Sequence, residues 1–315
     1  MKPLATLSLL LFSFYVNAQV TEAYYDYQWK PCAAENARFY SKVEKTDSGW
    51  FRRDYFLSNK NLQMQALFED NACKTINGHC YYFFANGNVD AIGHMVHNKE
   101  EGAYVRYYSN GMIADSAFYH NGIPTGSRIK WYRNGFMSDS IFHANDSMDI
   151  QVSWFDDGAV AAAGYFLRGK PYGKWKFYHR NGNLSEEEVY AKGEAVSKTY
   201  YNEDGSPRND TASVNKQPAF KNGIKAWQQY LSKNLIWPHG LEFSNGTMAV
   251  VVVGFTVNEE GKIEDEEVIV PFHPAFDIIA LRVIHNSPQW TPGMMHNRKV
   301  KYHFRQPVTF QQQED

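Results

Sequence analysis

The segment Met248–Val270, MAVVVVGFTVNEEGKIEDEEVIV, decides the fold of the C-terminal part of the chain. Its first ten residues, Met248–Val257, are apolar and rich in β-branched side chains, which favours a buried strand. Asn258–Gly261 has the composition of a hairpin turn, and Lys262–Val270 continues as a second strand. The segment therefore predicts an antiparallel hairpin.

Helical periodicity flanks this hairpin on both sides. Before it, an amphipathic helix is predicted by apolar residues at helical spacing, namely Ile224, Trp227, Leu231 and Leu235. After it, a short helix opens at Phe276–Asp277, carries Ile279, Val283 and Ile284 on one face, and ends at Ser287–Pro288. A last strand runs through Pro307–Val308 to Phe310. The predicted order is αββαβ, a small α+β domain over residues 219–315.

Short motifs recur through this domain in a fixed order: Trp237–Pro238, Gly261, Phe276–Asp277, Ala280-Leu281-Arg282-Val283, Ser287–Pro288, Trp290, Pro292–Gly293, and Pro307–Val308 with Phe310. In this order they resemble the TonB C-terminal domain family. Trp237 and Phe276 depart from that family's tyrosine and leucine, and both replacements can keep a packing role. The resemblance covers roughly a third of the chain.

The middle of the chain repeats itself. Glycines recur at spacings of 24, 24, 23, 24 and 23 residues in the dipeptides Asn86-Gly87, Asn110-Gly111, Asn134-Gly135, Asp157-Gly158, Asn181-Gly182 and Asp204-Gly205. Asn-Gly and Asp-Gly favour two-residue type I′ turns, so we predict a stacked array of β-hairpins over residues 78–205. Further turns are predicted at Asn121–Gly126 and Arg168–Gly173. The array resembles the bacterial variant of the MORN repeat.

These features divide the chain into five parts and give a mainly β fold. Residues 1–18 are predicted to be a signal peptide. Residues 19–77 form an N-terminal segment, in which Trp50–Phe68 reads as a degenerate first hairpin with its turn at Asn59–Asn61. The MORN-like array of residues 78–205 is followed by a polar linker at 206–218 and by the TonB-C-like domain at 219–315.

The N-terminus indicates export to the periplasm. An apolar run from Leu4 to Val16 follows Lys2, and the residues up to Ala18 fit a cleavage site after Ala18. The run has about 13 residues, fewer than the roughly 20 that a membrane-spanning helix needs. We therefore expect no stable membrane span. The alternative is an uncleaved N-terminal anchor in the inner membrane.

Composition excludes some partners. Lys and Arg number 32 against 34 Asp and Glu, a net charge of −2, which gives no electrostatic basis for binding nucleic acid. In an oxidising compartment, Cys73 and Cys80 are close enough in sequence to form a disulfide, which would leave Cys32 unpaired.

No motif predicts catalysis, a cofactor or a metal site. The S-x-x-K matches at Ser127–Lys130 and Ser213–Lys216 lie in a strand and in the linker, where no helix can present a nucleophile and its base. The histidines lack neighbouring ligands, as at His94 and His97. We expect a solvated charged edge in the acidic segment, defined as Glu259, Glu260, Glu264, Asp265, Glu266 and Glu267. An enzyme is not expected.

The TonB resemblance implies that a protein partner adds a strand to an exposed sheet edge, as TonB-like domains do with extended segments of outer-membrane transporters. The residues predicted to form this edge are Lys299, Val300, Lys301, Tyr302, His303 and Phe304. The expected function is that of a periplasmic adaptor linked to outer-membrane transport, with the array docking elsewhere. The alternative is an envelope scaffold, or an immunity or antitoxin-type protein, acting through the array.

Overall fold

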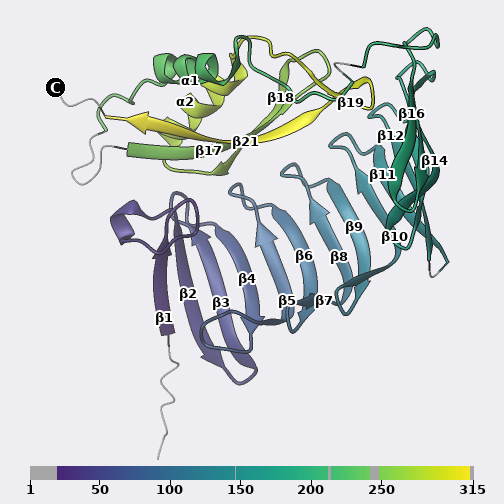
Figure 1. Cartoon of the computed structure of the whole chain (residues 1–315). Coiled ribbons are helices and arrows are strands. Elements are labelled where there is room, and N and C mark those ends of the chain that lie inside the picture. The colour runs from purple at the N-terminus through teal and green to yellow at the C-terminus, as the bar shows by residue number, and fades with distance from the viewer. Residues whose placement is uncertain (1–19, 146, 212–213, 242–247, 313–315) are drawn as a thin grey trace, which may run out of the picture.

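A computed structural model describes residues 20–145, 147–211, 214–241 and 248–312 (Figure 1). The predicted signal peptide lies outside the described residues. The chain forms a long curved ladder of antiparallel strands and a compact α+β domain packed beside it. The mainly β fold class with a small C-terminal α+β domain is therefore confirmed.

Sixteen strands form the ladder within the described residues, and nearly every strand pairs with its neighbours in sequence. They are β1 (Val20–Tyr25), β2 (Phe39–Thr46), β3 (Gly49–Phe56), β4 (Leu62–Phe68), β5 (Ile76–Phe83), β6 (Val89–Val96), β7 (Lys99–Glu100), β8 (Gly102–Tyr107), β9 (Ile113–His120), β10 (Ile123–Trp131), β11 (Met137–Asn145), β12 (Met148–Trp154), β13 (Val160–Leu167), β14 (Lys170–Tyr178), β15 (Leu184–Ala191) and β16 (Glu194–Tyr200). A short 3-10 helix, η1 (Ala34–Asn36), follows β1. The predicted degenerate first hairpin is β3–β4, and two further strands precede it.

The Asn-Gly turns are not the type I′ turns that the sequence predicts. In the first of them, the Gly87 N–H donates to the Phe84 carbonyl and the Phe84 N–H donates to the Asn88 carbonyl, while Gly87 has a φ of 89°. Asn86 is not among the residues with positive φ. These contacts define a three-residue loop, a type I turn closed by a glycine bulge. The prediction of type I′ geometry was wrong because Asn serves here as a hydrogen-bonding residue and only Gly needs the left-handed conformation.

Asparagine side chains in these turns connect each repeat to the next. The Asn86 side-chain oxygen accepts from the Asn88 N–H at 3.0 Å, and its Nδ2 donates to the carbonyl of Ser109 in the following turn at 2.9 Å. The same donation to the next turn occurs at Asn110, Asn134 and Asn181. Regular repeat spacing is therefore needed for this chain of bonds as well as for the strands.

Type I′ turns occur at the opposite edge of the ladder. Asn121 and Gly122 have φ values of 53° and 78°, and Arg168 and Gly169 have 51° and 73°. Both pairs open the second set of turns predicted from the sequence. The two edges of the ladder therefore carry different turn types.

Close packing on the ladder explains a glycine inside a strand. A Cβ on Gly164 would stand 2.1 Å from the ring of Trp175, which lies over it from the neighbouring strand β14. Trp175 and Phe177 are buried with Ala162 in a cluster of their own. Each repeat thus covers its neighbour, as in other stacked arrays.

The C-terminal domain has the predicted αββαβ order with one addition. Its elements are α1 (Gly223–Asn234), β17 (Met248–Val257), β18 (Ile263–Val270), α2 (Pro274–His285), β19 (Gly293–Met295), β20 (Arg298–Val300) and β21 (Tyr302–Gln311). The β19–β20 hairpin, with positive φ at His296 and Asn297, was not predicted. In α1, Trp227 is buried as expected, but Ile224 is 68% exposed. The sheet order is β18-β17-β21.

The predicted linker at residues 206–218 packs against its surroundings. Pro207 pairs with Tyr201, Lys216 pairs with Met294 of β19, and Val214 is buried. The array and the C-terminal domain are therefore joined by an ordered crossing wherever the structure describes this segment.

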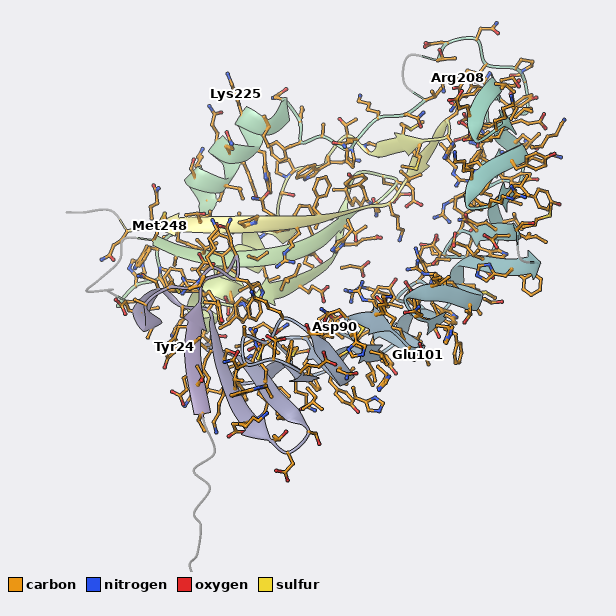
Figure 2. The ribbon with its side chains drawn as sticks, turned by 60° about the horizontal axis from the view of Figure 1, so that its bottom comes forward. Tyr24, Asp90, Glu101, Arg208, Lys225 and Met248 are labelled. Atoms are coloured by element: carbon orange, nitrogen blue, oxygen red, sulfur yellow. The ribbon has the colours of Figure 1, made fainter. Side chains whose placement is uncertain are left out.

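The C-terminal domain lies along the ladder edge that carries the Asn-Gly turns (Figure 1). Seen from another side, Asp90 and Glu101 lie near the middle of the ladder and Tyr24 and Arg208 lie towards its two ends (Figure 2). In the part of the chain that the structure describes, no helix combines the length and the apolar character needed to cross a membrane.

Candidate functional site

The three-stranded sheet has two edge strands, β18 and β21, and they differ in how readily they could pair with an added strand. β18 is irregular, because its pairing with β17 shifts register twice and Asp265 has a φ of 57°. It also carries most of the acidic segment. Bulges and charges on an edge strand discourage pairing with another chain. β21 pairs with β17 over ten residues without a shift, and no described residue pairs with its other side.

Pro307 fixes which backbone groups of β21 face the free edge. It lies opposite Val252, and it has no N–H to donate to β17. Pro307 must therefore occupy a non-hydrogen-bonded pair, whose backbone groups point away from the partner strand. Since this orientation alternates, the outward positions are His303, Arg305, Pro307, Thr309 and Gln311, and their side chains are all exposed.

The predicted edge residues fall on two different strands. Lys299 and Val300 belong to β20 and pair with Met294 and Gly293 of β19. Tyr302, His303 and Phe304 begin β21. The boundary of the candidate edge is therefore corrected to β21, because the unpredicted β19–β20 hairpin takes up the first two residues.

Lys301, the remaining residue of the predicted edge, forms ion pairs. Its ammonium lies 2.9 Å from a carboxylate oxygen of Asp156 in a ladder turn and also pairs with Glu264 of β18. Burial acts to lower the pKa of Lys301, but hydrogen bonds with Glu264 and Asp156 raise it overall. Lys301 therefore holds the start of β21 against the array.

A dense aromatic core supports β21 from the helical side. Trp290 and Phe310 are buried in the same cluster as Trp227, and Phe276 meets Phe310 edge to face at 5.0 Å. The Trp227 ring N–H donates to the Gln306 side chain at 3.1 Å. The edge strand is thus held on one face, while no described strand pairs with its outward side, where the Pro307 carbonyl accepts from the Gln306 side chain.

The acidic segment is not the solvated edge that the sequence predicts. Glu267 accepts a 2.8 Å hydrogen bond from Arg133, and Glu259 accepts one of 2.6 Å from Arg180. Both arginines come from Asn-Gly turns of the ladder. Arg180 also lies 2.9 Å from Asp156. The correction follows from the docking of the two parts, which places the acidic hairpin against Arg133 and Arg180.

The β19–β20 hairpin inserts its turn between the last repeats. Asn297, 2% exposed, donates to the carbonyls of Ser185 at 3.0 Å and Tyr201 at 2.7 Å. Arg298 donates to the carbonyl of Tyr178 at 2.9 Å and to that of Ala161. Burial lowers the pKa of Arg298 to about 10. This turn therefore adds donors to backbone carbonyls of the ladder, of which that of Ser185 also accepts from the Tyr201 N–H.

An apolar contact joins the other end of the domain to the first strands of the ladder. Phe39 and Phe56 of the ladder form one buried cluster with Val252 and Val270 of the three-stranded sheet. The face of the sheet opposite the helices is thus partly buried by the array. The two parts share an interface at both ends and in the middle.

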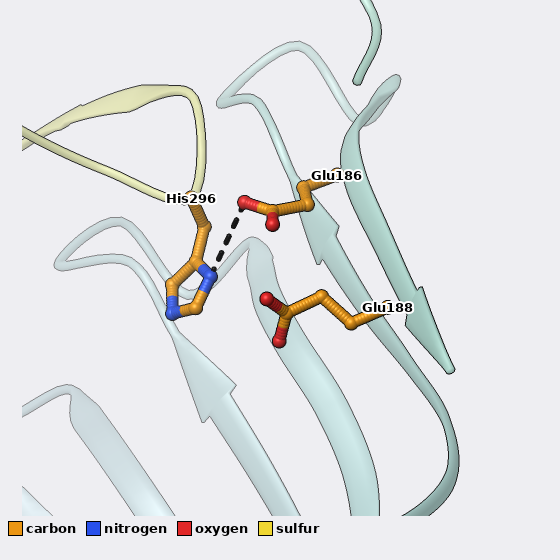
Figure 3. Close-up of side chains that lie close together, drawn as sticks. All are labelled: Glu186, Glu188 and His296. Atoms are coloured by element: carbon orange, nitrogen blue, oxygen red, sulfur yellow. Dashed lines mark ion pairs between the residues drawn. The ribbon is translucent and has the colours of Figure 1, made fainter. Parts of the chain in front are cut away.

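A group of metal-binding side chain types lies within this interface. Glu186 and Glu188 of β15 and His296 of the β19–β20 turn point towards one another (Figure 3), and their ligand atoms lie within 4.8 Å of each other. His296 Nδ1 is 3.3 Å from Glu186. Lys198 of β16 pairs with Glu188. The sequence analysis missed this group because it unites one strand of the array with a turn of the other domain.

The structure has Cys73 and Cys80 as free thiols in the same apolar cluster around Ala66. Burial raises the pKa of both thiols. Their disulfide stays a prediction.

Two further surface hollows are lined by described residues. One of about 280 Å³ lies at the interface and is lined by Phe155, His179, Arg180, Asn181, Glu203, Glu259, Glu260, Arg298 and Lys299. The other, about 360 Å³, is lined by Tyr24, Tyr40, Tyr55, Phe56, Leu57 and Lys60 on the first strands.

Comparison with known families agrees with this architecture. Residues 243–311 match the family described as Gram-negative bacterial TonB protein C-terminal. Residues 171–192, which cover most of β14 and all of β15, match a MORN repeat variant. No curated protein matches the chain. The C-terminal domain is therefore similar to the Gram-negative TonB C-terminal family, and the last repeats of the hairpin array are similar to the MORN repeat variant.

Proposed function

We propose that this protein is a protein-binding adaptor of the Gram-negative envelope, in which β21 accepts an extended segment of a partner as an additional strand. The observation that carries the proposal is the regular ten-residue pairing of β21 with β17, with its other side unpaired by any described residue. Strand addition gains affinity from main-chain hydrogen bonds and makes few demands on sequence. The TonB C-terminal match supports a protein partner.

The proposed partner is a segment of an outer-membrane transporter, and the proposed location is the periplasm after cleavage following Ala18. The support for this location is the N-terminal sequence, with its short apolar run, together with the Gram-negative family match. In this proposal the ladder is the platform on which the binding domain is fixed, since it contacts that domain at Phe39 among its first strands and at Ser185 among its last.

Arg305 allows a sharp test. Its side chain is exposed and its backbone N–H points to the free edge by the alternation that Pro307 sets. Arg305→Pro removes one outward donor without removing a bond to β17. Arg305→Ala removes only the side chain. Extended plug segments of outer-membrane transporters, made as fluorescent peptides, are titrated with the full-length protein and followed by anisotropy.

We expect saturable binding by the wild type and by Arg305→Ala, and at least about tenfold weaker binding by Arg305→Pro, the equivalent of about 1.4 kcal/mol. Thermal unfolding checks that both variants fold. Absence of saturable binding by the wild type, or equal binding by the two variants, would contradict strand addition at β21.

A further inference from the structure

Of two neighbouring buried glutamates of the array, Glu186 lacks the hydrogen-bond partners that a buried carboxylate needs. Glu186 is 0% exposed and Glu188 is 1% exposed. Neither oxygen of Glu186 has a hydrogen-bond partner among the described residues, and its ion-pair contacts are at 3.3 Å to His296 and 3.7 Å to Lys198. A buried carboxylate without hydrogen bonds is costly unless a cation satisfies it. The surroundings of Glu186 are therefore suited to a cation.

We propose that Glu186, Glu188 and His296 bind a divalent transition-metal ion, which joins the repeat array to the C-terminal domain. The donor set is two carboxylates and one imidazole, and their ligand atoms already lie within 4.8 Å of one another (Figure 3). Ligands about 2.0–2.2 Å from a tetrahedral zinc ion stand about 3.4 Å apart. Small side-chain rotations bring the three groups to that spacing.

The backbone of both elements presents these ligands. Glu186 and Glu188 share one face of β15 because strand residues alternate, and Glu187 between them faces the other way and pairs with Lys174. His296 is held by the stacking of its ring on Phe177, with ring centroids 3.5 Å apart. Neither element can supply the complete site alone.

A second layer of contacts orients the ligands. The Tyr190 hydroxyl donates to one oxygen of Glu188 at 2.6 Å, and the other oxygen accepts from the Lys198 ammonium. Beside His296, Asn297 is fixed by the carbonyls of Ser185 and Tyr201. Outer contacts of this kind set the direction of metal ligands in proteins.

The ammonium group of Lys198 competes with a metal ion for the two carboxylates. Its ammonium pairs with Glu188, so the two carboxylates share a single lysine. The Lys198 side chain is 39% exposed, so its ammonium can turn out to solvent when an ion enters. Metal binding is then an exchange of one ammonium for a divalent cation, and removal of the lysine should strengthen it.

Imidazole with carboxylates suits zinc and other first-row transition ions better than magnesium or calcium, which prefer oxygen ligands alone. Zn²⁺ is therefore the probe.

Full-length protein, stripped with a chelator and desalted, is titrated with Zn²⁺ in a calorimeter, and bound zinc is counted after gel filtration. The melting temperature is recorded with and without the ion.

We expect one zinc ion at this site per chain and a higher melting temperature with zinc, since a ligand that binds only the folded state stabilises it. Glu186→Gln should lose this binding. His296→Phe keeps an aromatic ring to stack on Phe177 but offers no nitrogen ligand, and it should lose the binding too. Lys198→Met should bind zinc about tenfold more tightly, because no ammonium competes.

Glu187→Gln is the matched control, since it lies between the two ligands on the opposite face, and it should bind zinc as the wild type does. Zinc binding that survives both Glu186→Gln and His296→Phe would place the ion elsewhere and overturn the proposal. Absence of zinc binding by folded wild type and Lys198→Met would also overturn it, and would leave the proposed strand addition at β21 untouched.

Discussion

At the scale of single residues, a few polar side chains determine how the two parts of the molecule fit together. Asn297 combines a φ of 58° with two donated bonds to ladder carbonyls, and its side-chain oxygen accepts from Arg208 at 2.8 Å. Asn is among the few residues that tolerate this backbone conformation. The same residue therefore closes a turn and supplies the bonds that dock it.

Replacing Asn297 with alanine should lower the free energy of unfolding by more than the strain of a positive φ alone would. The change leaves the Ser185 and Tyr201 carbonyls without this donor, in a site that is 2% exposed. Each hydrogen bond contributes about 0.5–1.5 kcal/mol net, so the loss of the two that Asn297 donates costs about 1–3 kcal/mol. Urea unfolding measures the difference in the free energy of unfolding.

Asn121→Ala is the control, because Asn121 also has positive φ in a turn but lies exposed at the far edge of the ladder. We expect Asn297→Ala to lower the free energy of unfolding by about 1–3 kcal/mol more than Asn121→Ala does. Equal losses in the two variants would mean that the Asn297 contacts add nothing to stability.

At the scale of elements, two hairpins of the C-terminal domain make polar contacts that dock it on the ladder. The β17–β18 hairpin presents its acidic segment to the Asn-Gly turns, and the β19–β20 hairpin inserts its tip beside β15. Among these turns, Asp156 is a junction, since it contacts both Arg180 and Lys301. The hairpins therefore couple C-terminal strands to ladder turns through charged groups.

This junction predicts a response to acid. Burial acts to raise the pKa of Asp156, but hydrogen bonds from Lys301 and Arg180 lower it overall from its ordinary value of 3.8. A carboxyl group whose pKa is lowered on folding contributes stability that is complete above the ordinary value and is lost as pH falls through the folded value. The contribution of Asp156 should therefore disappear below about pH 4.

Asp156→Asn should accordingly destabilise the protein at neutral pH and show a smaller loss of unfolding free energy on acidification than the wild type. Unfolding in urea across this pH range gives both values. Asp157→Asn is the control, because the Asp157 side chain is 55% exposed and Asn fills the same position in other repeats. If the two variants respond to pH alike, Asp156 is not the junction described.

At the scale of the whole molecule, the ladder and the C-terminal domain behave as one packed body in the described residues. Polar contacts at the last repeats and the apolar cluster at the first strands lie at opposite ends of the same interface. The array thus holds the sheet that carries β21 at two separate points. A free edge strand on a fixed sheet is well placed to accept a partner.

Phe56→Ala should separate the two parts. Phe56 is 4% exposed and packs with Val252 and Val270 of the C-terminal sheet, so its loss should cost about 3–5 kcal/mol and weaken the interface. Phe68→Ala is matched in exposure, 4%, but lies in a cluster inside the ladder. We expect a single thermal transition for the wild type.

Pulsed hydrogen exchange read by mass spectrometry along the thermal transition follows the same unfolding with two probes, peptides of the C-terminal core around Trp227 and Trp290 and peptides of the ladder. Phe56→Ala should give different midpoints by the two probes, while Phe68→Ala should lower both together. Coincident midpoints in Phe56→Ala would show that this cluster does not couple the parts.

The sequence by itself determined the local structure: the hairpin over Met248–Val270, the two helices, and the repeat register of the Asn-Gly turns. These features depend on backbone preference and on periodicity, which neighbouring residues encode. The turn type was missed because an Asn-Gly pair suits more than one loop, and the bonds that Asn86 donates to Ser109 select between them. The β19–β20 hairpin was missed because three-residue strands carry almost no periodic signal.

Only the tertiary structure decided which surfaces meet. The acidic segment lies against Arg133 and Arg180 because the curvature of the whole ladder brings its turn edge beside β18, and that curvature adds up over many strands. The same docking brings His296 to Glu186 and leaves the outer side of β21 free of described partners. Contacts between residues so far apart in the chain depend on geometry that no local pattern contains.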